Sequence, residues 1–221
     1  MMDQAWILAS NSPRRKELLA LFRHPFDIQP ANIDEAVFPG EAAGDYVMRM
    51  ARTKAQALKK DGRKEGIILA ADTTVSLNQE ILGKPGTADE AREMLKLLRG
   101  KGHQATTALV FTKPGGEMVE ETCCSEVPMR DYADQEIENY IQTRDPFDKA
   151  GGYAIQHAGF HPVRNFQGCF ANVMGLPLCH LARALIRNGY QPSVQINQAC
   201  QGFLRYDCPI SERVLAGETI G

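Results

Sequence analysis

The segment from Ile67 to Leu77, with the sequence IILAADTTVSL, limits the fold of this chain more than any other stretch. A short apolar run of this kind predicts a buried β-strand. Asp72 interrupts the run, and a carboxylate inside a buried strand costs free energy unless a cation or hydrogen-bond donors contact it. Two interpretations follow. Asp72 lies in solvent where the strand ends, or it faces a cleft as a site carboxylate that needs a positive partner.

The size and charge of the chain restrict its partners. The 221 residues are enough for one large domain or two small lobes, and a hydrophobic content of 43% supports a real core. The 25 basic and 27 acidic residues give a net charge of -2, whereas proteins that bind nucleic acid usually carry a basic face. Aromatic residues are not interleaved with basic ones either. We therefore expect no nucleic-acid partner, while a local basic cluster that binds a small anion remains compatible with the charge.

The N-terminal residues, the apolar runs and the cysteines bear on the cellular compartment of the protein. No charged segment followed by a long apolar run opens the chain, so no secretory signal is expected. No apolar run approaches the roughly 18 residues that a membrane span needs, so no membrane partner is expected. Six cysteines without a signal peptide predict a reducing cytosol. None of them forms a CxxC pair, and a structural zinc site is not expected from their spacing.

The first predicted helix carries an unusual charge pattern. Ser12 precedes a proline and is suited to cap a helix that follows a short strand. The first turn then holds Arg14, Arg15 and Lys16. Cations at a helix N-terminus oppose the helix dipole, so we interpret this turn as an anion site where backbone N–H groups and guanidinium groups bind together. The alternative is an ordinary solvated basic turn.

Hydrophobic periodicity and caps predict the other elements. They are strands over residues 26–30, 106–112, 118–129 and 153–156, and helices over 42–60, 87–99, 134–142 and 178–187. Lys54 falls in the apolar stripe of the second helix, where its side chain either extends to the surface or points into a cleft. Gln156 ends the last strand with an amide that can bind a base edge or a sugar. Residues 191–221 are expected to be a C-terminal extension, packed on a domain of residues 1–190 or partly disordered.

Five motifs occur in a fixed order along the chain, namely SNSPRRKELL from Ser10, ADT from Ala71, GKP from Gly83, DKAG from Asp148 and NVMGLP from Asn172. Together they resemble the Maf family of nucleoside triphosphate pyrophosphatases, over about residues 5–190. The resemblance implies an α/β fold with a mixed, elongated, twisted sheet flanked by helices. It implies two lobes with a central cleft, similar to the inosine triphosphatase architecture. It also implies a cytoplasmic enzyme that uses a divalent metal, Mg²⁺ or Mn²⁺, and often forms a homodimer.

The same resemblance assigns roles to individual residues. Asp72 would be the catalytic acid–base group, and Glu35 would help it hold the metal. The phosphates would be held by Ser10, Arg14, Arg15, Lys54 and Lys84. Base selectivity would rest on Arg14, Thr73 and Gln156, and this combination resembles the branch of the family that acts on dTTP and UTP.

The implied reaction is hydrolysis of the α–β phosphoanhydride bond of dTTP and UTP, with modified pyrimidine nucleotides as further candidate substrates. The products would be a nucleoside monophosphate and pyrophosphate. Asp72 would accept a proton from the attacking water or bind the metal that acidifies it, and the sequence does not separate these roles. A second hypothesis is a nucleotide-binding regulator of septum formation and cell division that has no significant turnover.

Overall fold

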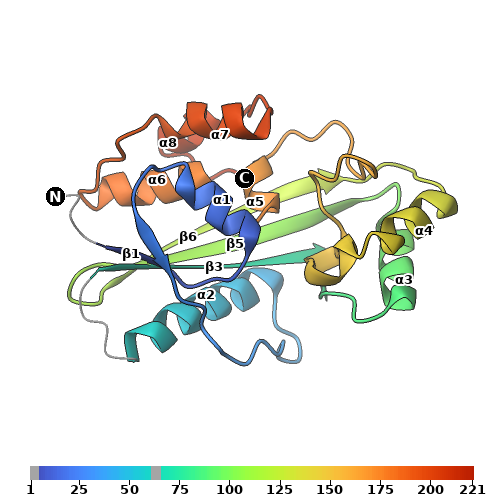
Figure 1. The fold of residues 1–221 in the computed structure, drawn as a ribbon, viewed down its shortest axis with the longest axis horizontal. Helices are drawn as coiled ribbons and strands as arrows, with labels where there is room; N and C mark the ends of the chain where they lie inside the picture. The colour runs from blue at the N-terminus through green and yellow to red at the C-terminus, as the bar shows by residue number, and fades with distance from the viewer. Residues whose placement is uncertain (1–4, 61–65) are drawn as a thin grey trace.

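One elongated mixed sheet runs through the molecule (Figure 1). The computed structural model describes residues 5–60 and 66–221. The strands are β1 (Trp6–Leu8), β2 (Phe26–Ile28), β3 (Ile67–Leu77), β4 (Glu80–Leu82), β5 (Gly102–Thr112) and β6 (Met118–Pro128). Their order is β2-β1-β3-β5-β6, with β4 paired to β3. β1 pairs parallel with β2 and β3, and the other pairings are antiparallel, which confirms the predicted mixed sheet.

β3 is the central strand, and it spans the residues that its apolar run predicts. Successive side chains of a strand point to opposite faces of the sheet. Ile67, Leu69 and other odd-numbered residues belong to the larger hydrophobic core. The even-numbered Ile68 and Ala70 pack instead into a smaller core against the helix α2 (Ala43–Lys60). Asp72 therefore faces the side of the sheet that α2 covers, and Thr73 faces the opposite side.

One edge of β3 lacks a strand neighbour in its middle. β1 pairs with residues 67–69, and β4 pairs with residues 75–77. On the other edge, β5 runs beside β3 from Leu69 to Ser76. Within the part of the chain that the structure describes, residues 70–74 are thus paired with a strand on the β5 side only. This gap leaves room beside Asp72 for groups from other segments.

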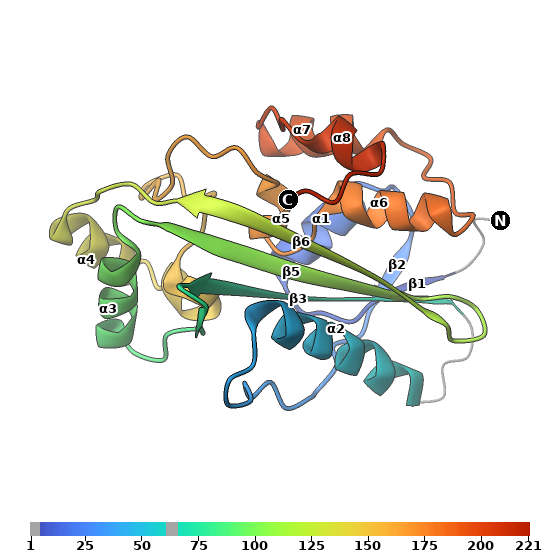
Figure 2. The same ribbon diagram turned by 180° about the vertical axis from the view of Figure 1, so that it is seen from behind.

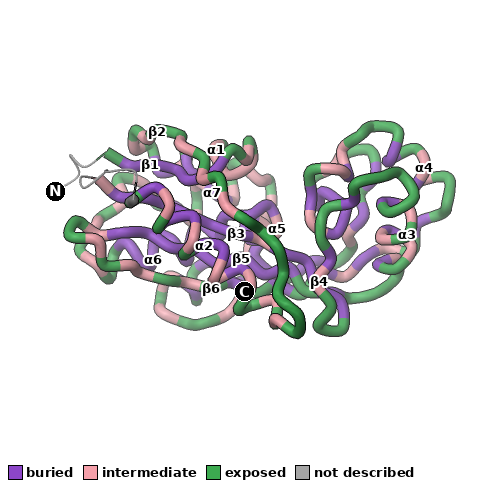
Figure 3. Tube along the Cα trace, turned by 90° about the horizontal axis from the view of Figure 1, so that it is seen from below, coloured by how far each residue is buried: buried purple, intermediate pink, exposed green. Residues whose placement is uncertain are grey.

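The helices cover both faces and the far end of the sheet. They are α1 (Pro13–Ala20), α2 (Ala43–Lys60), α3 (Ala88–Leu98), α4 (Asp134–Gln142), α5 (Phe170–Val173), α6 (Leu178–Arg187), α7 (Ile196–Leu204) and α8 (Ser211–Leu215). Figure 2 shows α2 on one side of the long strands and α5 to α8 on the other. In Figure 3 the part that carries α3 and α4 stands apart from the rest, with β4 near the junction. The predicted two-part α/β arrangement is confirmed.

Local sequence signals account for several of these helices. Ser12 caps α1, and its hydroxyl accepts a hydrogen bond from the Arg15 N–H at 3.4 Å. The predicted apolar stripe of α2 is fully buried. Thr87 caps α3, and its hydroxyl accepts a hydrogen bond from the Glu90 N–H at 3.2 Å. The Glu90 carboxylate accepts in turn from the N–H of Gly86 at 2.6 Å.

The predicted strand over residues 153–156 is wrong. Two short 3₁₀-helical turns, Asp145–Asp148 and Ala150–Gly152, lead into this segment, and the latter ends with two glycines at φ angles of 73° and 67°. The N–H of Ala154 then donates to the Tyr140 hydroxyl at 2.9 Å instead of to a strand. The apolar pattern of Tyr153–Ile155 reflects burial in the interior and not membership of a sheet. Lys149, Gly151 and Gly152 just before this segment are buried as well.

Residues 191–221 form α7 and α8, which pack against α6. Ile196, Cys200, Ile210 and Val214 from this segment are buried in the larger hydrophobic core. The described residues include no helix with the length and apolar character that crossing a membrane requires.

Candidate functional site

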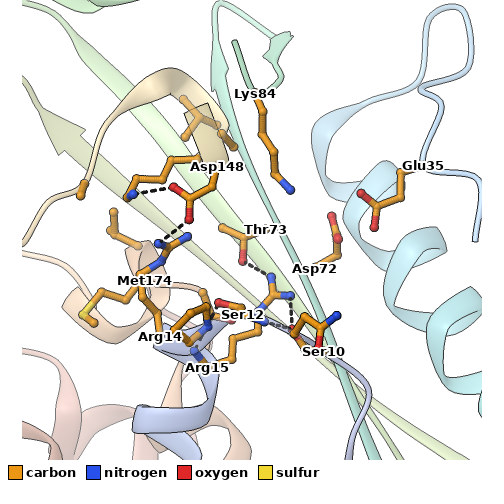
Figure 4. A pocket seen from close by; sticks show the side chains of 18 of the residues that line it. Ser10, Ser12, Arg14, Arg15, Glu35, Asp72, Thr73, Lys84, Asp148 and Met174 are labelled. Carbon is orange, nitrogen blue, oxygen red and sulfur yellow. Dashed lines mark hydrogen bonds and ion pairs between the residues drawn. The ribbon is translucent and has the colours of Figure 1, made fainter. Parts of the chain in front are cut away.

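A cavity of ≈ 430 Å³ opens beside the gap in the β3 pairing. The segments that wall it come from both parts of the molecule (Figure 4). Its lining includes every residue for which the sequence predicts a site role: Ser10, Arg14, Arg15, Glu35, Lys54, Asp72, Thr73, Lys84 and Gln156. Predicted site residues separated by up to 146 positions in the chain, Ser10 and Gln156, thus line one cavity.

Lys54 joins the two carboxylates at the centre of the site. Its ammonium lies 2.5 Å from the Asp72 Oδ1 and 2.7 Å from the Glu35 Oε1. Asp72 is 6% exposed and Lys54 is 8% exposed, so each buried charge has its counter-charge. For both Asp72 and Lys54, the structure supports the interpretation in which the side chain points into a cleft. Asp72 is not in solvent, and Lys54 does not extend to the surface.

Glu35 is the more accessible of the two carboxylates. Partial burial would raise its pKa, but the hydrogen bond and positive charge of Lys54 outweigh this effect, with help from Lys84 and Arg15, and the pKa of Glu35 is lowered. Lys84 is exposed, and its ammonium points toward the space between Thr73 and the carboxylates (Figure 4). Glu35 therefore stays ionised at neutral pH and keeps its oxygens available as acceptors.

Arg15 organises the opposite wall. Its guanidinium donates to the Gly175 carbonyl at 2.9 Å, to the Thr73 hydroxyl at 3.0 Å and to the Ser10 hydroxyl at 3.4 Å. Burial lowers its pKa, although the charge of Asp72 acts in the other direction. An arginine stays charged despite such a shift. The side chain is thus held rigidly with its positive charge at the cavity wall.

Thr73 is held by a chain of hydrogen bonds. The Thr107 hydroxyl donates to the Asn172 carbonyl at 3.0 Å, and it can therefore only accept from the Thr73 hydroxyl, which lies 2.9 Å away. Thr73 in turn accepts from Arg15. Its single proton is already in use, so the Thr73 hydroxyl can meet a ligand only as an acceptor. The chain links the cavity to the buried Asn172, the first residue of the NVMGLP motif.

A cluster of ion pairs lies on the opposite side of the cavity, and the sequence analysis assigned no role to its residues Asp145, Asp148 and Lys149. Arg14 Nη1 lies 3.3 Å from Asp148 Oδ2, and the buried ammonium of Lys149 lies 2.6 Å from Asp148 Oδ1 and 2.7 Å from Asp145 Oδ1. Burial would raise the pKa of Asp148, but Lys149 and Arg14 outweigh it and the pKa is lowered. The DKAG motif was the available signal for this group. Asp148 holds Arg14 in place across the cavity.

The wall as a whole attracts anions. Five cationic side chains and three carboxylates line it, which leaves an excess of two positive charges. Gln156 is exposed and lies at the wall formed by residues 148–156. A polyphosphate fits the cationic part of this surface, and an uncharged ring could meet the amide of Gln156.

The comparisons with known proteins agree with the motifs. A family profile described as "Maf-like protein" matches residues 5–188. A protein from Anaeromyxobacter dehalogenans named "dTTP/UTP pyrophosphatase" is 44% identical over 83% of this chain and 94% of its own length. Proteins of the same name from Chromobacterium violaceum and Bacillus cereus are 43% and 42% identical, over 86% and 81% of this chain and 97% and 93% of their own. Among solved structures, the Staphylococcus aureus Ham1 protein matches with a TM-score of 0.43 and 15% identity, over 58% of this chain and 73% of that one.

Proposed function

The chain belongs to the Maf family, and from this premise we propose that it hydrolyses dTTP and UTP to the nucleoside monophosphate and pyrophosphate. Relatives that share 42–44% of their residues with it over most of their length carry the name of this activity. The observation that supports the proposal most directly is the single cavity in which all the predicted site residues meet. Its positive excess suits a substrate that carries several negative charges at neutral pH.

The phosphates would lie against the cationic wall. Ser10 and Arg15 are already joined by a hydrogen bond, and Arg14, which precedes Arg15 in α1, pairs with Asp148 at the same cavity. Lys54 and Lys84 approach from the side of the carboxylates. Fixed donors around a leaving pyrophosphate stabilise the charge that develops on it, without reorganisation during the reaction.

A divalent metal would be held by Glu35 and Asp72. Both carboxylates already converge on one cationic group, the Lys54 ammonium. Carboxylate oxygens are the ligands that Mg²⁺ and Mn²⁺ prefer, and Mg²⁺ in nucleotide enzymes is usually bound by one or two carboxylates together with substrate phosphates. The residues present therefore fit such an ion. When bound, it would neutralise charge on the phosphate oxygens.

Asp72 would act where water attacks the α-phosphorus. The new bond forms between the water oxygen and this phosphorus, the bond to the bridging oxygen of the pyrophosphate breaks, and a proton leaves the water. Two roles of Asp72 fit its position, acceptance of this proton and ligation of the metal. Lys54 positions the carboxylate in either case.

Recognition of the base would use Gln156 and Thr73. The amide of Gln156 offers a donor and an acceptor, and Thr73 offers an acceptor. A site built to hydrogen-bond one base rejects others because its own polar groups are left unpaired. The cytoplasmic location and the homodimer that the family resemblance implies stay predictions.

The test is a panel of nucleoside triphosphates with product identification. We expect dTTP and UTP to be hydrolysed well ahead of ATP and GTP, with equal amounts of monophosphate and pyrophosphate released. Turnover should fall by about 10²-fold or more in Asp72→Asn, and a chelator should abolish it. The exposed Cys124→Ser on β6, which does not line the cavity, serves as the control.

Two outcomes would contradict the proposal. A flat profile over the panel would exclude the pyrimidine assignment. Binding of dTTP without any pyrophosphate release, with Mg²⁺ or Mn²⁺ present, would favour the nucleotide-binding regulator instead.

A further inference from the structure

Four free cysteines from four separate segments line a second cavity. None of them lines the cavity that contains Asp72. They are Cys169 just before α5, Cys179 in α6, Cys200 in α7 and Cys208 between α7 and α8. Most of the remaining wall is apolar, with Phe170, Ala171, Leu178 and Leu204 among its residues. Figure 2 shows how α5 to α8 gather on this side of the sheet. Nothing in the nucleotide site explains why these thiols share one hollow.

The four sulfurs are not gathered closely enough to ligate one metal ion together. No three of these four cysteines have sulfurs within 4.8 Å of one another, since in residues 5–60 and 66–221 only Cys123, Cys169 and His180 form such a group. A single tetrahedral ion with metal–sulfur bonds of ~2.3 Å would bring its ligands to within ~3.8 Å. All four cysteines instead line a cavity of ≈ 10 Å³. An iron–sulfur core is larger and holds four cysteine sulfurs farther apart.

Two of the four cysteines lie in turns that hydrogen bonds to their own carbonyls hold in place. The N–H groups of Asn172 and Val173 donate to the Cys169 carbonyl at 3.0 Å and 3.3 Å. The Ser211 hydroxyl donates to the Cys208 carbonyl at 3.3 Å. These bonds fix the backbone beside two of the four thiols.

From this arrangement we propose that Cys169, Cys179, Cys200 and Cys208 ligate an iron–sulfur cluster. Each thiol loses one proton as it binds iron. A four-iron core takes two ferrous ions, two ferric ions and four sulfide ions, so its assembly needs no further oxidant. Two ligands precede residue 190 and two follow it. The cluster therefore fastens the C-terminal helices α7 and α8 to the nucleotide-binding part, and its binding free energy adds to the stability of the fold. The proposal is independent of the proposed function.

Cys123 and His180 lie beside this site and define its competitor. Together with Cys169 they could bind one zinc ion, because all three ligand atoms lie within 4.8 Å. His180 donates from Nε2 to the Ile220 carbonyl at 2.9 Å, and its buried Nδ1 has no hydrogen-bond partner in the described residues. Such a zinc site would not use Cys179, Cys200 or Cys208 as ligands, and it would not explain why they line the same cavity. The cluster accounts for those three thiols.

The test measures the metal content of the full chain. The protein is purified without oxygen, and iron, acid-labile sulfide and zinc are determined per chain, before and after reconstitution with equal amounts of ferrous and ferric iron and with sulfide. We expect iron and sulfide in equal molar amounts, with visible absorption that reduction by dithionite bleaches. The half-buried Cys208→Ser should lose most of the iron, and the exposed Cys124→Ser should keep it. Circular dichroism of each variant shows whether loss of iron reflects loss of the fold.

Two results would overturn the proposal. One is wild-type protein that contains no iron after anaerobic purification and after reconstitution, a result that does not depend on any variant. The other is one zinc ion per chain that is kept in Cys208→Ser and lost in Cys123→Ser and His180→Gln. dTTP hydrolysis by the same samples is recorded separately, so a failure of either proposal is recognised on its own.

Discussion

Gly175 lies where Arg15 and Thr73 meet, and its missing side chain makes this contact possible. Its φ angle is +108°, and a Cβ atom there would lie 3.2 Å from Arg15 Nε and 3.3 Å from Thr73 Oγ1. Its own carbonyl also accepts from Arg15. The residue thus sets the position of a guanidinium that would bind phosphate.

We predict that Gly175→Ala moves Arg15 and impairs the enzyme. The strained backbone and the close contacts should cost on the order of 1 kcal/mol of unfolding free energy. Loss of alignment at the phosphates should lower kcat/KM for dTTP by roughly tenfold or more, because small displacements of binding groups are costly. Steady-state kinetics and urea unfolding measure both effects.

Gly202 in α7 offers a matched control. A Cβ atom there meets nothing within 4 Å, and its φ is not positive. Gly202→Ala should leave kcat/KM unchanged and stabilise the helix slightly. Equal kinetics for the two alanine variants would show that the close approach at Gly175 has no role in the site.

At the residue scale, prediction succeeded where one side chain had few alternatives. Asp72 was expected either in solvent at the end of its strand or beside a cation in a cleft, and Lys54 in the buried stripe of α2 is that cation. The partner of Arg14 could not be read in the same way. Asp148 is 134 positions away, and only the fold brings it within 3.3 Å.

Helix α6 depends on a buried ion pair. The Arg183 side chain is 3% exposed and forms a two-pronged contact with the carboxylate of Glu121, which is 15% exposed. It also donates to the carbonyls of Val214 and Glu218 in the C-terminal segment. One side chain thus connects α6, β6 and the last helix.

We predict that Arg183→Met destabilises the protein by about 3–5 kcal/mol, because it leaves the Glu121 charge without a partner. Arg213→Met, which removes the exposed pair with Glu218, should cost about 0–1 kcal/mol. Urea unfolding at neutral pH compares the two. The double variant Arg183→Met, Glu121→Leu should recover part of the loss. If the two single variants cost the same, the buried pair does not support the docking of residues 191–221.

At the element scale, periodicity and caps were reliable for β3, α2 and α4, whose bounds follow the predicted ones closely. They failed for residues 153–156. Buried apolar side chains occur in any segment that crosses the interior, and a run of four cannot distinguish a strand from a turn. The two left-handed glycines and the Tyr140 hydroxyl decide the conformation there.

The stability of the whole molecule should depend on a buried histidine. His103 at the start of β5 is 2% exposed, and its Nε2 lies 2.7 Å from the Tyr153 hydroxyl. Burial lowers the pKa of His103 to about 4. In the unfolded chain its pKa is about 6.5. As the pH falls below about 6.5, the unfolded state takes up a proton that the folded state does not accept until about pH 4.

We therefore predict that the titration of His103 lowers the free energy of unfolding as the pH falls from about 6.5 to about 4. The slope approaches 1.4 kcal/mol per pH unit, so the total is on the order of 3 kcal/mol. Unfolding free energies of wild type and His103→Gln are compared at pH 7 and pH 4.5, since other groups titrate in both proteins. The loss on acidification should be smaller in His103→Gln. A loss of the same size in both proteins would exclude His103 as the cause.

By itself, the sequence determined the mixed α/β fold class, the central strand, the main helices and the family, and it predicted site residues that all line one cavity. These follow from local patterns and from motifs that keep their order along the chain. Only the tertiary structure decided which carboxylate meets which cation, where β3 lacks a neighbour, and that four cysteines without a CxxC pair surround one hollow. Such contacts join distant segments, and their energies depend on burial and distance, which spacing along a chain does not contain.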